Sequence, residues 1–598
     1  MKTNINVRNI ILKTKPLQKP LETYVFPVIL LLYSFVGVNQ GVDITDTMYS
    51  LGNYEYLDHL SLMWKISTYL SNVTGSLLMK LPGAGTLMGM NIYCSLFIAA
   101  AALLAYYILS NFIPKWMIFI GEYAAISLCW CPRVILYNYM TYLFLTIGAL
   151  AIYAALTDYR GRKRYLFIAG IFLGLNVMVR FPNVTEAALI VVVWFYDALN
   201  GDKFKMILKD TLLCIGGYIV GFVLPLIGIS IAYGPAAYIE SILGLFGMTE
   251  GAQDYTAGSM IASILSAYGT TLSEMAIIIP CVFVGMLMFL MWKDKYVRIK
   301  KVIFLMGVLV LLRYYFLEGV FTRSYYYYDS VFEVAMMFII IGIILSLLGI
   351  FNVLKGSNEE RMLSMMALII ILITPLGSNN YTYPVLNNMF ITAPIIMWLL
   401  RRAMQRFGGA DIIGGSRYGR GYIDRMKWLV NFPWEAITIA LILLLTIQGT
   451  FFRINYSFVD GTDGVPRSEK ITEIPKAKGM YTSGYNKEKL ETLYIYLNEQ
   501  NLLGEKVILF GKIPGISYLF DMEPAIFSSW PDLDSYATDL MPTALEELDD
   551  SDLPLIIVHK DFEGEVLAQT KYDILLDYMA TKDYNKDFEN DYFEVYRK

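Results

Sequence analysis

Two aspartates lie directly after the first long apolar run of this 598-residue chain, in the sequence Gly41-Val-Asp43-Ile-Thr-Asp46-Thr-Met-Tyr49. A carboxylate at the border of a membrane can act as a general base toward a hydroxyl group, because restricted hydration raises its pKa toward neutral pH. The alternative is structural: Asp46 precedes a plausible helix, and it would then be a solvated loop acid or a helix N-cap. The residues alone leave both interpretations open.

Four arginines near the outer ends of apolar runs are candidates for binding an anionic group, because such a charge usually faces a cavity or a partner. They are Arg133, Arg180, Arg313 and Arg323. Each could equally be an interfacial anchor that reaches the lipid headgroups. Arg323 precedes Tyr325 to Tyr328, a run that suits stacking on sugar rings but is more typical of an aromatic belt at the membrane surface.

The elements that carry these residues are predicted to be membrane-spanning helices. The chain is 56% hydrophobic and 17% charged, with a mean hydropathy of +0.50, which is too apolar for a soluble protein of this length. A bilayer core of about 30 Å requires about 20 apolar residues per helix. The predicted spans, about thirteen in number, lie near residues 24–40, 86–110, 116–131, 134–157, 165–180, 182–199, 206–233, 269–292, 301–317, 330–352, 361–376, 388–400 and 433–450.

The charges of the short loops predict how these spans are oriented. Lysine and arginine gather in the N-terminal segment 1–23 and in alternate loops, which places these segments in the cytoplasm. The basic loops are 158–164, 203–205, 293–301, 355–361 and 401–427. An odd number of spans within 24–450 places the C-terminus outside the cytoplasm. The localisation expected is a plasma membrane, and the scarcity of histidine and the abundance of Tyr, Lys, Ile and Met fit a bacterium.

Two outer segments are too long to be plain connectors. The first outer loop, 41–85, has apolar residues at helical spacing between His59 and Leu81, which predicts a helix lying on the membrane surface. The segment 234–268 is expected to be a re-entrant or surface helix that covers a groove, or else a disordered loop.

From residue 451 to residue 598 the composition is that of a separate soluble domain. The runs 506–510 and 554–558 have the pattern of buried strands, and 486–502 and 563–580 have the pattern of amphipathic helices. These elements predict a small α/β domain on the outer face of the membrane.

Metal and disulfide chemistry have few candidate residues. The five cysteines all lie in or beside apolar runs, and His59 and His559 are the only histidines. Neither a disulfide framework nor a zinc site is therefore predicted. No cofactor is expected with certainty, a divalent metal held by carboxylates stays open, and no nucleic-acid partner is expected.

The layout resembles that of the GT-C glycosyltransferases, and among them the protein O-mannosyltransferases and the bacterial aminoarabinose transferase. The shared features are a first span that starts in the cytoplasm, a first outer loop with an acid-x-x-Tyr element, many further spans and an outer C-terminal domain. Asp46 and Tyr49 match that element, with Thr47 in place of a second acid, so the alignment leaves Asp43 and Asp46 as alternatives. The segment Gly170 to Arg180 resembles the family's glycine-containing helix that ends in a basic residue.

The resemblance implies an inverting enzyme that moves a sugar from a polyprenyl-phosphate donor to a hydroxyl of a glycan, lipid or protein acceptor on the outer face. The residues that it implies are Asp46 and Asp43 for catalysis, Arg180, Arg133 and Arg323 for the donor phosphate, and Tyr49, His59, Tyr325 and Tyr326 for the substrate. Two other classes stay open. A transporter or flippase of lipid-linked glycans often has internal repeats, and none is clear here. A non-catalytic glycan-binding scaffold would not need the two aspartates.

Overall fold

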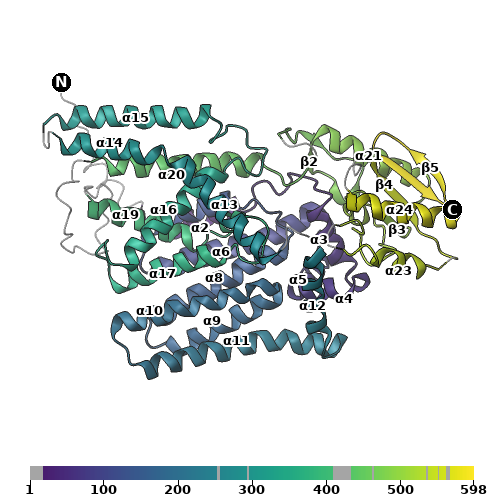
Figure 1. Ribbon diagram of the computed structural model, residues 1–598, viewed down its shortest axis with the longest axis horizontal. Coiled ribbons are helices and arrows are strands. Elements are labelled where there is room, and N and C mark those ends of the chain that lie inside the picture. Colours follow the sequence, from purple (N-terminus) through teal and green to yellow (C-terminus); the bar gives the residue numbers. More distant parts are fainter. Residues whose placement is uncertain are drawn as a thin grey trace.

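The computed structural model describes residues 18–598 except 252–255, 292–294, 408–431, 461–463, 534–535, 550 and 561–565. Figure 1 shows a long helical body with a smaller domain of helices and strands at one end. The body contains a π-helix Leu21–Val25, α2 (Phe26–Tyr33), α3 (Asp46–Glu55), a 3-10 turn Leu57–His59, α4 (Leu62–Ser67), α5 (Tyr69–Met79), α6 (Leu87–Leu109), α7 (Lys115–Ser127), α8 (Leu136–Thr157), α9 (Arg162–Val179), a 3-10 segment Phe181–Leu189, α10 (Ile190–Asn200), α11 (Phe204–Tyr233), α12 (Ala237–Gly251), α13 (Ala257–Met275), α14 (Ile278–Leu290), α15 (Val297–Leu317), α16 (Phe332–Ile350), α17 (Asn358–Ile373), α18 (Tyr383–Asn387), α19 (Thr392–Phe407) and α20 (Trp434–Asn455).

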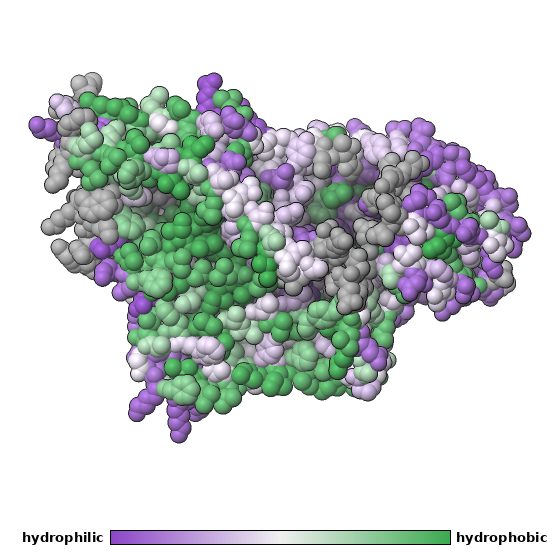
Figure 2. Space-filling view, in the orientation of Figure 1, coloured by the Kyte–Doolittle hydropathy of each residue, from purple (hydrophilic) through white to green (hydrophobic). Residues whose placement is uncertain are grey.

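Seven helical segments among the described residues are long and apolar enough to cross a membrane. They are 87–109, 136–157, 181–200, 204–233, 258–290, 332–350 and 434–455. The other six predicted runs are helical as well, but they are shorter or carry several basic residues at one end. Figure 2 shows apolar side chains covering the helical body and hydrophilic ones covering the domain at its end. A mostly helical chain with several helices long and apolar enough to span a membrane is thus confirmed, while the number thirteen stays a prediction.

The orientation of the chain can be tested with a reporter that is active only outside the cytoplasm. We expect activity when the reporter is fused after Lys598, because the basic loops alternate along the chain. A fusion near Arg417, which lies outside the described residues, is expected to be inactive. An active reporter near Arg417 combined with an inactive one after Lys598 would contradict both the span number and the side assigned to the C-terminal domain.

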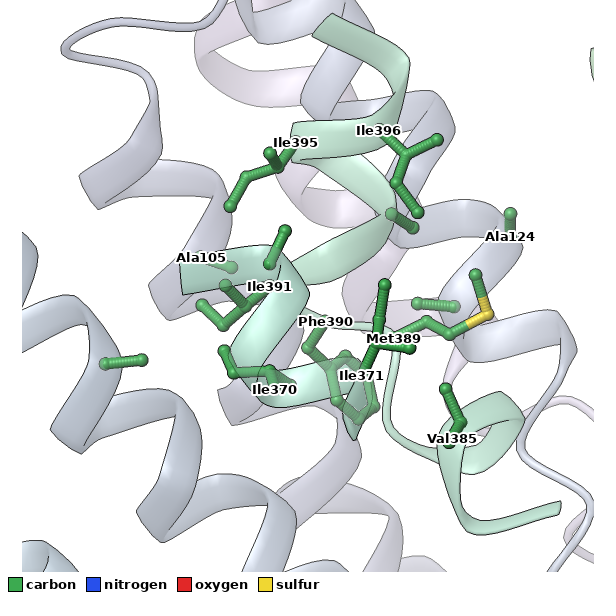
Figure 3. Close-up of a cluster of buried hydrophobic side chains, with 14 of the residues drawn as sticks. Ala105, Ala124, Ile370, Ile371, Val385, Met389, Phe390, Ile391, Ile395 and Ile396 are labelled. Carbon is green, nitrogen blue, oxygen red and sulfur yellow. The ribbon is translucent and has the colours of Figure 1, made fainter. Parts of the chain in front are cut away.

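The shortest predicted run, 388–400, forms the centre of the body rather than a lipid-facing helix. Every residue from 389 to 400 is buried. Its helix α19 packs against α7, α16 and α17, and Figure 3 shows the segment together with Ala124 of α7 and with Ile370 and Ile371 of α17. The side chains that it packs there include Ala105, Ala124, Ile370, Ile371, Val385, Met389, Phe390, Ile391, Ile395 and Ile396. A helix that is apolar on all sides is typically enclosed by protein, which explains how so short a run is accommodated.

Two pairs of glycines allow α9 and α11 to approach closely. A Cβ atom at Gly170 would lie 2.0 Å from the carbonyl oxygen of Cys214, and one at Gly174 would lie 2.1 Å from that of Tyr218. Gly217 and Gly221 make the same kind of contact from α11 toward α9. Small residues four apart are a common means of packing helices in membranes. This contact fixes α9, whose end positions Arg180.

We expect Gly174→Ala to destabilise the protein by about 1–3 kcal/mol, because the added methyl group would force the two backbones apart. Gly307→Ala in α15 is the matched control, since a Cβ there has no neighbour within 4 Å. Thermal unfolding of the detergent-solubilised protein measures both. Equal midpoints for Gly174→Ala and wild type would contradict the packing argument.

The two segments predicted to lie outside, 41–85 and 234–268, are helical in much of their described parts and pack on one another. The apolar stretch predicted as one surface helix, His59 to Leu81, is divided at Thr68 into α4 and α5. The segment 234–268 contains α12 and the start of α13, so in its described part it is helical rather than a disordered loop. α12 packs against α4, where Ile66, Tyr238 and Ile242 share a buried cluster.

The C-terminal domain is the predicted small α/β fold. Its elements are β1 (Glu469–Lys470), a 3-10 turn Pro475–Ala477, β2 (Tyr481–Thr482), α21 (Gly484–Glu499), β3 (Val507–Phe510), α22 (Gly515–Leu519), α23 (Leu540–Glu546), β4 (Leu555–His559), α24 (Val566–Thr581), β5 (Asn585–Glu589) and β6 (Phe593–Arg597). Its main sheet has the order β3-β4-β6-β5, in which β3 and β4 are parallel and fully buried. The hairpin β5-β6 and the pair β1-β2 were not predicted.

Candidate active site on the outer loop

The loop that carries both aspartates is held by the C-terminal domain. The Gly41 N–H donates to the carbonyl oxygen of Tyr481 in β2 at 2.8 Å. The Asn486 side chain in α21 donates to the Val42 carbonyl oxygen at 2.9 Å, and the Gly515 N–H donates to that of Ile44 at 2.8 Å. Three elements of the domain therefore fix the backbone just before Asp46.

The helix α3, which begins at Asp46, is fixed at its other end to the loop before α8. The Tyr54 hydroxyl donates to the Val134 carbonyl oxygen at 2.9 Å and accepts from the Leu136 N–H at 3.2 Å. Gly75 of α5 makes room for the Tyr54 ring, because a Cβ there would lie 2.3 Å from it. The Asp46 carboxylate at the start of α3 acts electrostatically on Cys131 and Tyr137, although these residues are far apart in the sequence.

Asp43 is buried, and its carboxylate is fully engaged. One oxygen accepts from the backbone N–H and the hydroxyl of Thr45, and the other accepts from the Thr47 N–H at 2.8 Å. Burial raises the pKa of Asp43, and these hydrogen bonds oppose the shift. The capping role considered for Asp46 is thus performed by Asp43, which closes the turn that leads into α3.

Asp46 differs from Asp43 in both exposure and bonding. Its side chain is accessible to water, and none of the described residues donates a hydrogen bond to it. The surrounding protein nevertheless limits its hydration and, together with the Asp43 carboxylate, raises the pKa of Asp46 to about 7. A group with this pKa can take up a proton at neutral pH while staying ionised about half of the time.

Arg180 is loosely held within the protein. It is half-buried at the end of α9, and its guanidinium group makes two long hydrogen bonds of 3.4 Å, to the Asn138 side chain and to the Gly377 carbonyl oxygen. Both the Asp46 carboxylate and the Arg180 guanidinium act electrostatically on Cys131 and Tyr137. Because its present bonds are weak, Arg180 can exchange them for stronger bonds to an anion.

Arg133 binds backbone carbonyl groups at the end of the first helical segment. It donates to the carbonyl oxygens of Val36 and Gly37, and the buried Arg453 donates to that of Ser34 at 2.8 Å. Basic groups at the C-terminal end of a helix satisfy its last carbonyls and interact favourably with its dipole. Both arginines line a cavity of about 60 Å³ that Asp43 also lines. Arg453 lies just after the last predicted span. The criterion that selected Arg133, an arginine near the end of an apolar run, would therefore also have selected Arg453.

Tyr49 and His59 contact the C-terminal domain. The Tyr49 hydroxyl lies 3.1 Å from that of Tyr536, and its ring packs edge-on against Trp530 at 5.6 Å. His59 Nδ1 lies 2.9 Å from a carboxylate oxygen of Glu523. Both residues therefore connect the segment 41–85 to the C-terminal domain in this structure, and their contact with a substrate stays a prediction.

The loop after α15 lies apart from Asp46. The exposed Arg323 packs its guanidinium over the Phe316 ring at 5.5 Å, and Tyr325 stacks on Phe451 at 5.5 Å, while Tyr326 is half-buried. Within the described residues, no contact joins these three side chains to Asp46 or Arg180. Arg313 is exposed on α15.

The cavity that Asp43 lines is bordered by a group of aromatic residues, of which the sequence analysis considered only Tyr328, within the run Tyr325 to Tyr328. Trp130 packs against Tyr328, Tyr383 and Phe458 with ring centroids 5.2–6.4 Å apart, and it lines the same cavity as Asp43. Its members come from four distant parts of the chain, so no local pattern predicts it. In the part of the chain that the structure describes, three or more His, Cys, Asp or Glu side chains do not gather as a metal site would require.

Comparison with known proteins gives only distant matches. No family model matches the sequence, and no curated protein matches it. Similar solved structures include the Archaeoglobus fulgidus oligosaccharyltransferase with zinc and sulfate, at 13% identity and a TM-score of 0.44, covering 89% of this chain and 68% of that one. The archaeal oligosaccharyltransferase AglB from the same organism, with an inhibitory peptide and a dolichol-phosphate, matches at 12% identity with a TM-score of 0.45. That match covers 90% of this chain and 70% of that one. The A. fulgidus enzyme tethered to an acceptor peptide matches at 12% identity with a TM-score of 0.44. That match covers 90% of this chain and 69% of that one. A likeness this distant does not assign the chain to a family.

Proposed function

We propose that this chain is a membrane glycosyltransferase of the GT-C type, which transfers a sugar from a polyprenyl-phosphate donor to an acceptor hydroxyl at the outer face. The observation that carries the proposal concerns two side chains, Asp46 and Arg180. One is a water-accessible carboxylate with a pKa of about 7, the other is a loosely held guanidinium, and both act electrostatically on Cys131 and Tyr137. A base and an anion-binding group are what transfer from a phosphate ester requires.

In the proposed reaction, Asp46 accepts the proton of the acceptor hydroxyl as its oxygen attacks the anomeric carbon of the sugar. The bond between that carbon and the phosphate oxygen breaks, and the electron pair leaves with the polyprenyl phosphate. Arg180 stabilises the charge that develops on the departing phosphate. A single displacement of this kind inverts the configuration at the anomeric carbon. Asp43 positions Asp46 by holding the turn before α3.

An apolar pocket in the body supports a lipid-borne donor. It has a volume of about 510 Å³ and lies between α14, α15, α16 and α20, with Met288, Val308 and Ile341 in its walls. Its outer end reaches Phe321, two residues before Arg323. A polyprenyl chain is apolar along its length and suits such walls, and Arg323 would then meet the donor phosphate as it enters.

The proposal can be tested with purified protein in liposomes that contain a polyprenyl-phosphate sugar labelled in the sugar. We expect the label to leave the lipid fraction and polyprenyl phosphate to appear, in proportion to the amount of protein. If the labelled lipid crosses the bilayer intact instead, the chain is a transporter. If the lipid binds but neither crosses nor reacts, the chain is a binding scaffold.

A further inference from the structure

Glu186 is a carboxyl group buried inside a helical segment that is long and apolar enough to cross a membrane. It lies in the 3-10 part, Phe181–Leu189, of the segment 181–200, and it is only 4% exposed. An ionisable side chain buried in such a segment is costly, so it usually has a charged partner or a function. Its surroundings therefore indicate what Glu186 does.

A network of hydrogen bonds holds the Glu186 side chain in place. The side-chain nitrogen of Asn176 in α9 donates to a Glu186 carboxylate oxygen at 2.7 Å and to the Thr141 carbonyl oxygen in α8 at 3.0 Å. Asn183 donates to the Thr141 hydroxyl at 2.7 Å and to the Asn176 carbonyl oxygen at 2.9 Å. All four residues are buried. The carboxyl group is therefore fixed relative to both α8 and α9.

Glu186 shares a small cavity with Arg180, the residue that follows α9. The volume of the cavity is about 20 Å³, and its lining includes Glu186, Arg180, Asn183, Thr185 and Thr374. This space is sufficient for one water molecule, which requires two to four polar partners, and the lining offers them. The Arg180 charge also acts electrostatically on Glu186. A water molecule in this cavity would therefore link the carboxylate to the guanidinium.

The remaining bonds of Arg180 are too weak to neutralise its charge, because both are 3.4 Å long and go to the uncharged groups of Asn138 and Gly377. We propose that Glu186 is the counter-ion of Arg180 while the donor is absent, and that the donor phosphate replaces it. This inference rests on the proposed function, in which Arg180 binds that phosphate.

A counter-ion at this place affects how tightly phosphate groups bind. A carboxylate close to Arg180 repels a phosphate and competes with it for the guanidinium, so it lowers the affinity for both the donor and the polyprenyl phosphate that leaves. Weaker binding of the leaving phosphate favours its release after the reaction. Glu186 is thus a positioning residue that acts through Arg180 and does not touch the substrate.

The test is the binding of geranylgeranyl phosphate, a prenyl phosphate, to the full-length protein in detergent, measured by titration calorimetry. Glu186→Gln keeps the size of the side chain and an oxygen that can accept from Asn176, but it removes the charge. We expect this variant to bind geranylgeranyl phosphate roughly three- to tenfold more tightly than wild type. Binding of the uncharged geranylgeraniol should not change. A merely structural role predicts weaker binding, so a gain in affinity separates the two roles.

Further variants connect the effect to Arg180. In the Arg180→Gln background, Glu186→Gln should no longer tighten binding, because the group through which it acts is gone. Glu122→Gln is the matched control, since Glu122 is a buried carboxyl group of α7 outside the described lining of this cavity, and its affinity should equal that of wild type. If Glu186→Gln does not fold, Glu186→Met gives the same test, because it fills a similar volume without a charge.

Several results would overturn the proposal. They are unchanged or weaker binding of geranylgeranyl phosphate by the folded variant, an equal gain in Glu122→Gln, and a gain that persists in the Arg180→Gln background. Failure of the proposed function is a separate result, in which wild type transfers no sugar in liposomes whatever the binding data show. If wild type does transfer, polyprenyl phosphate should inhibit Glu186→Gln at a roughly three- to tenfold lower concentration than it inhibits wild type.

Discussion

Asp46→Asn is expected to lower the rate of sugar transfer by roughly 10²–10⁴-fold, the usual contribution of a general base. The amide keeps the size of the side chain but cannot accept a proton at neutral pH. Because the described residues donate no hydrogen bond to Asp46, its replacement by an amide of the same size breaks no hydrogen bond among them, and the protein should insert in the membrane and bind the donor normally. Transfer in membranes with a labelled lipid-linked sugar measures the effect.

The pH dependence of the wild type gives an independent measure of the same group. A base acts in its ionised form, so kcat/KM should rise with pH and reach half of its plateau near pH 7, where Asp46 is half ionised. Below that pH the carboxyl group is protonated and activity falls. The residual activity of Asp46→Asn should lack this midpoint.

Asp43→Asn is the matched control for Asp46→Asn. It puts an NH₂ group against one of the N–H donors of Thr45 or Thr47, so it should destabilise the turn before α3 by about 1–3 kcal/mol. Activity should fall less than in Asp46→Asn, and the midpoint of the pH profile should stay. Wild-type turnover by Asp46→Asn would refute the assignment, and complete loss in Asp43→Asn alone would move the base to Asp43.

Arg180→Ala is expected to weaken use of the donor by about 1.5–3 kcal/mol, or roughly 10- to 150-fold in kcat/KM, because a charged hydrogen bond to phosphate is lost. Its two bonds within the protein are long, at 3.4 Å, so folding should change little. The measurement is the dependence of the transfer rate on donor concentration at matched protein levels.

Two variants make this result specific. Arg180→Lys keeps the charge but not the forked geometry, so it should restore part of the lost activity. Arg323→Ala removes an exposed arginine whose contact is the Phe316 ring, and it should affect donor use less. Unchanged donor use in Arg180→Ala would return this residue to the role of an interfacial anchor.

Local patterns predicted the elements that form through local interactions. The apolar runs became helices, and the two buried strands became β3 and β4, because length, hydropathy and alternation depend on residues close in sequence. The hairpin β5-β6 was missed. Its strand β5, Asn-Lys-Asp-Phe-Glu, is mostly exposed and polar, so it has no apolar pattern to detect.

The surroundings of the aspartates depend on contacts between distant segments. The turn before α3 gives Asp43 its hydrogen bonds and leaves Asp46 without any from the described residues. This turn is held by β2, α21 and α22, which lie more than 400 residues later in the sequence. The bond from Tyr54 to the loop before α8 likewise joins segments about 80 residues apart. No sequence pattern records such pairings, so the sequence could rank the two aspartates only through a resemblance.

The central claim is that Asp46 and Arg180 act on one donor from the outer side. The most direct measurement is an experimental structure of Asp46→Asn with a bound polyprenyl-phosphate sugar, since this variant should hold the donor without consuming it. We expect the phosphate within hydrogen-bond distance of Arg180 and the anomeric carbon facing residue 46, with space for an acceptor hydroxyl between them. A donor phosphate bound at the cytoplasmic ends of the helices, or away from both residues, would contradict the account.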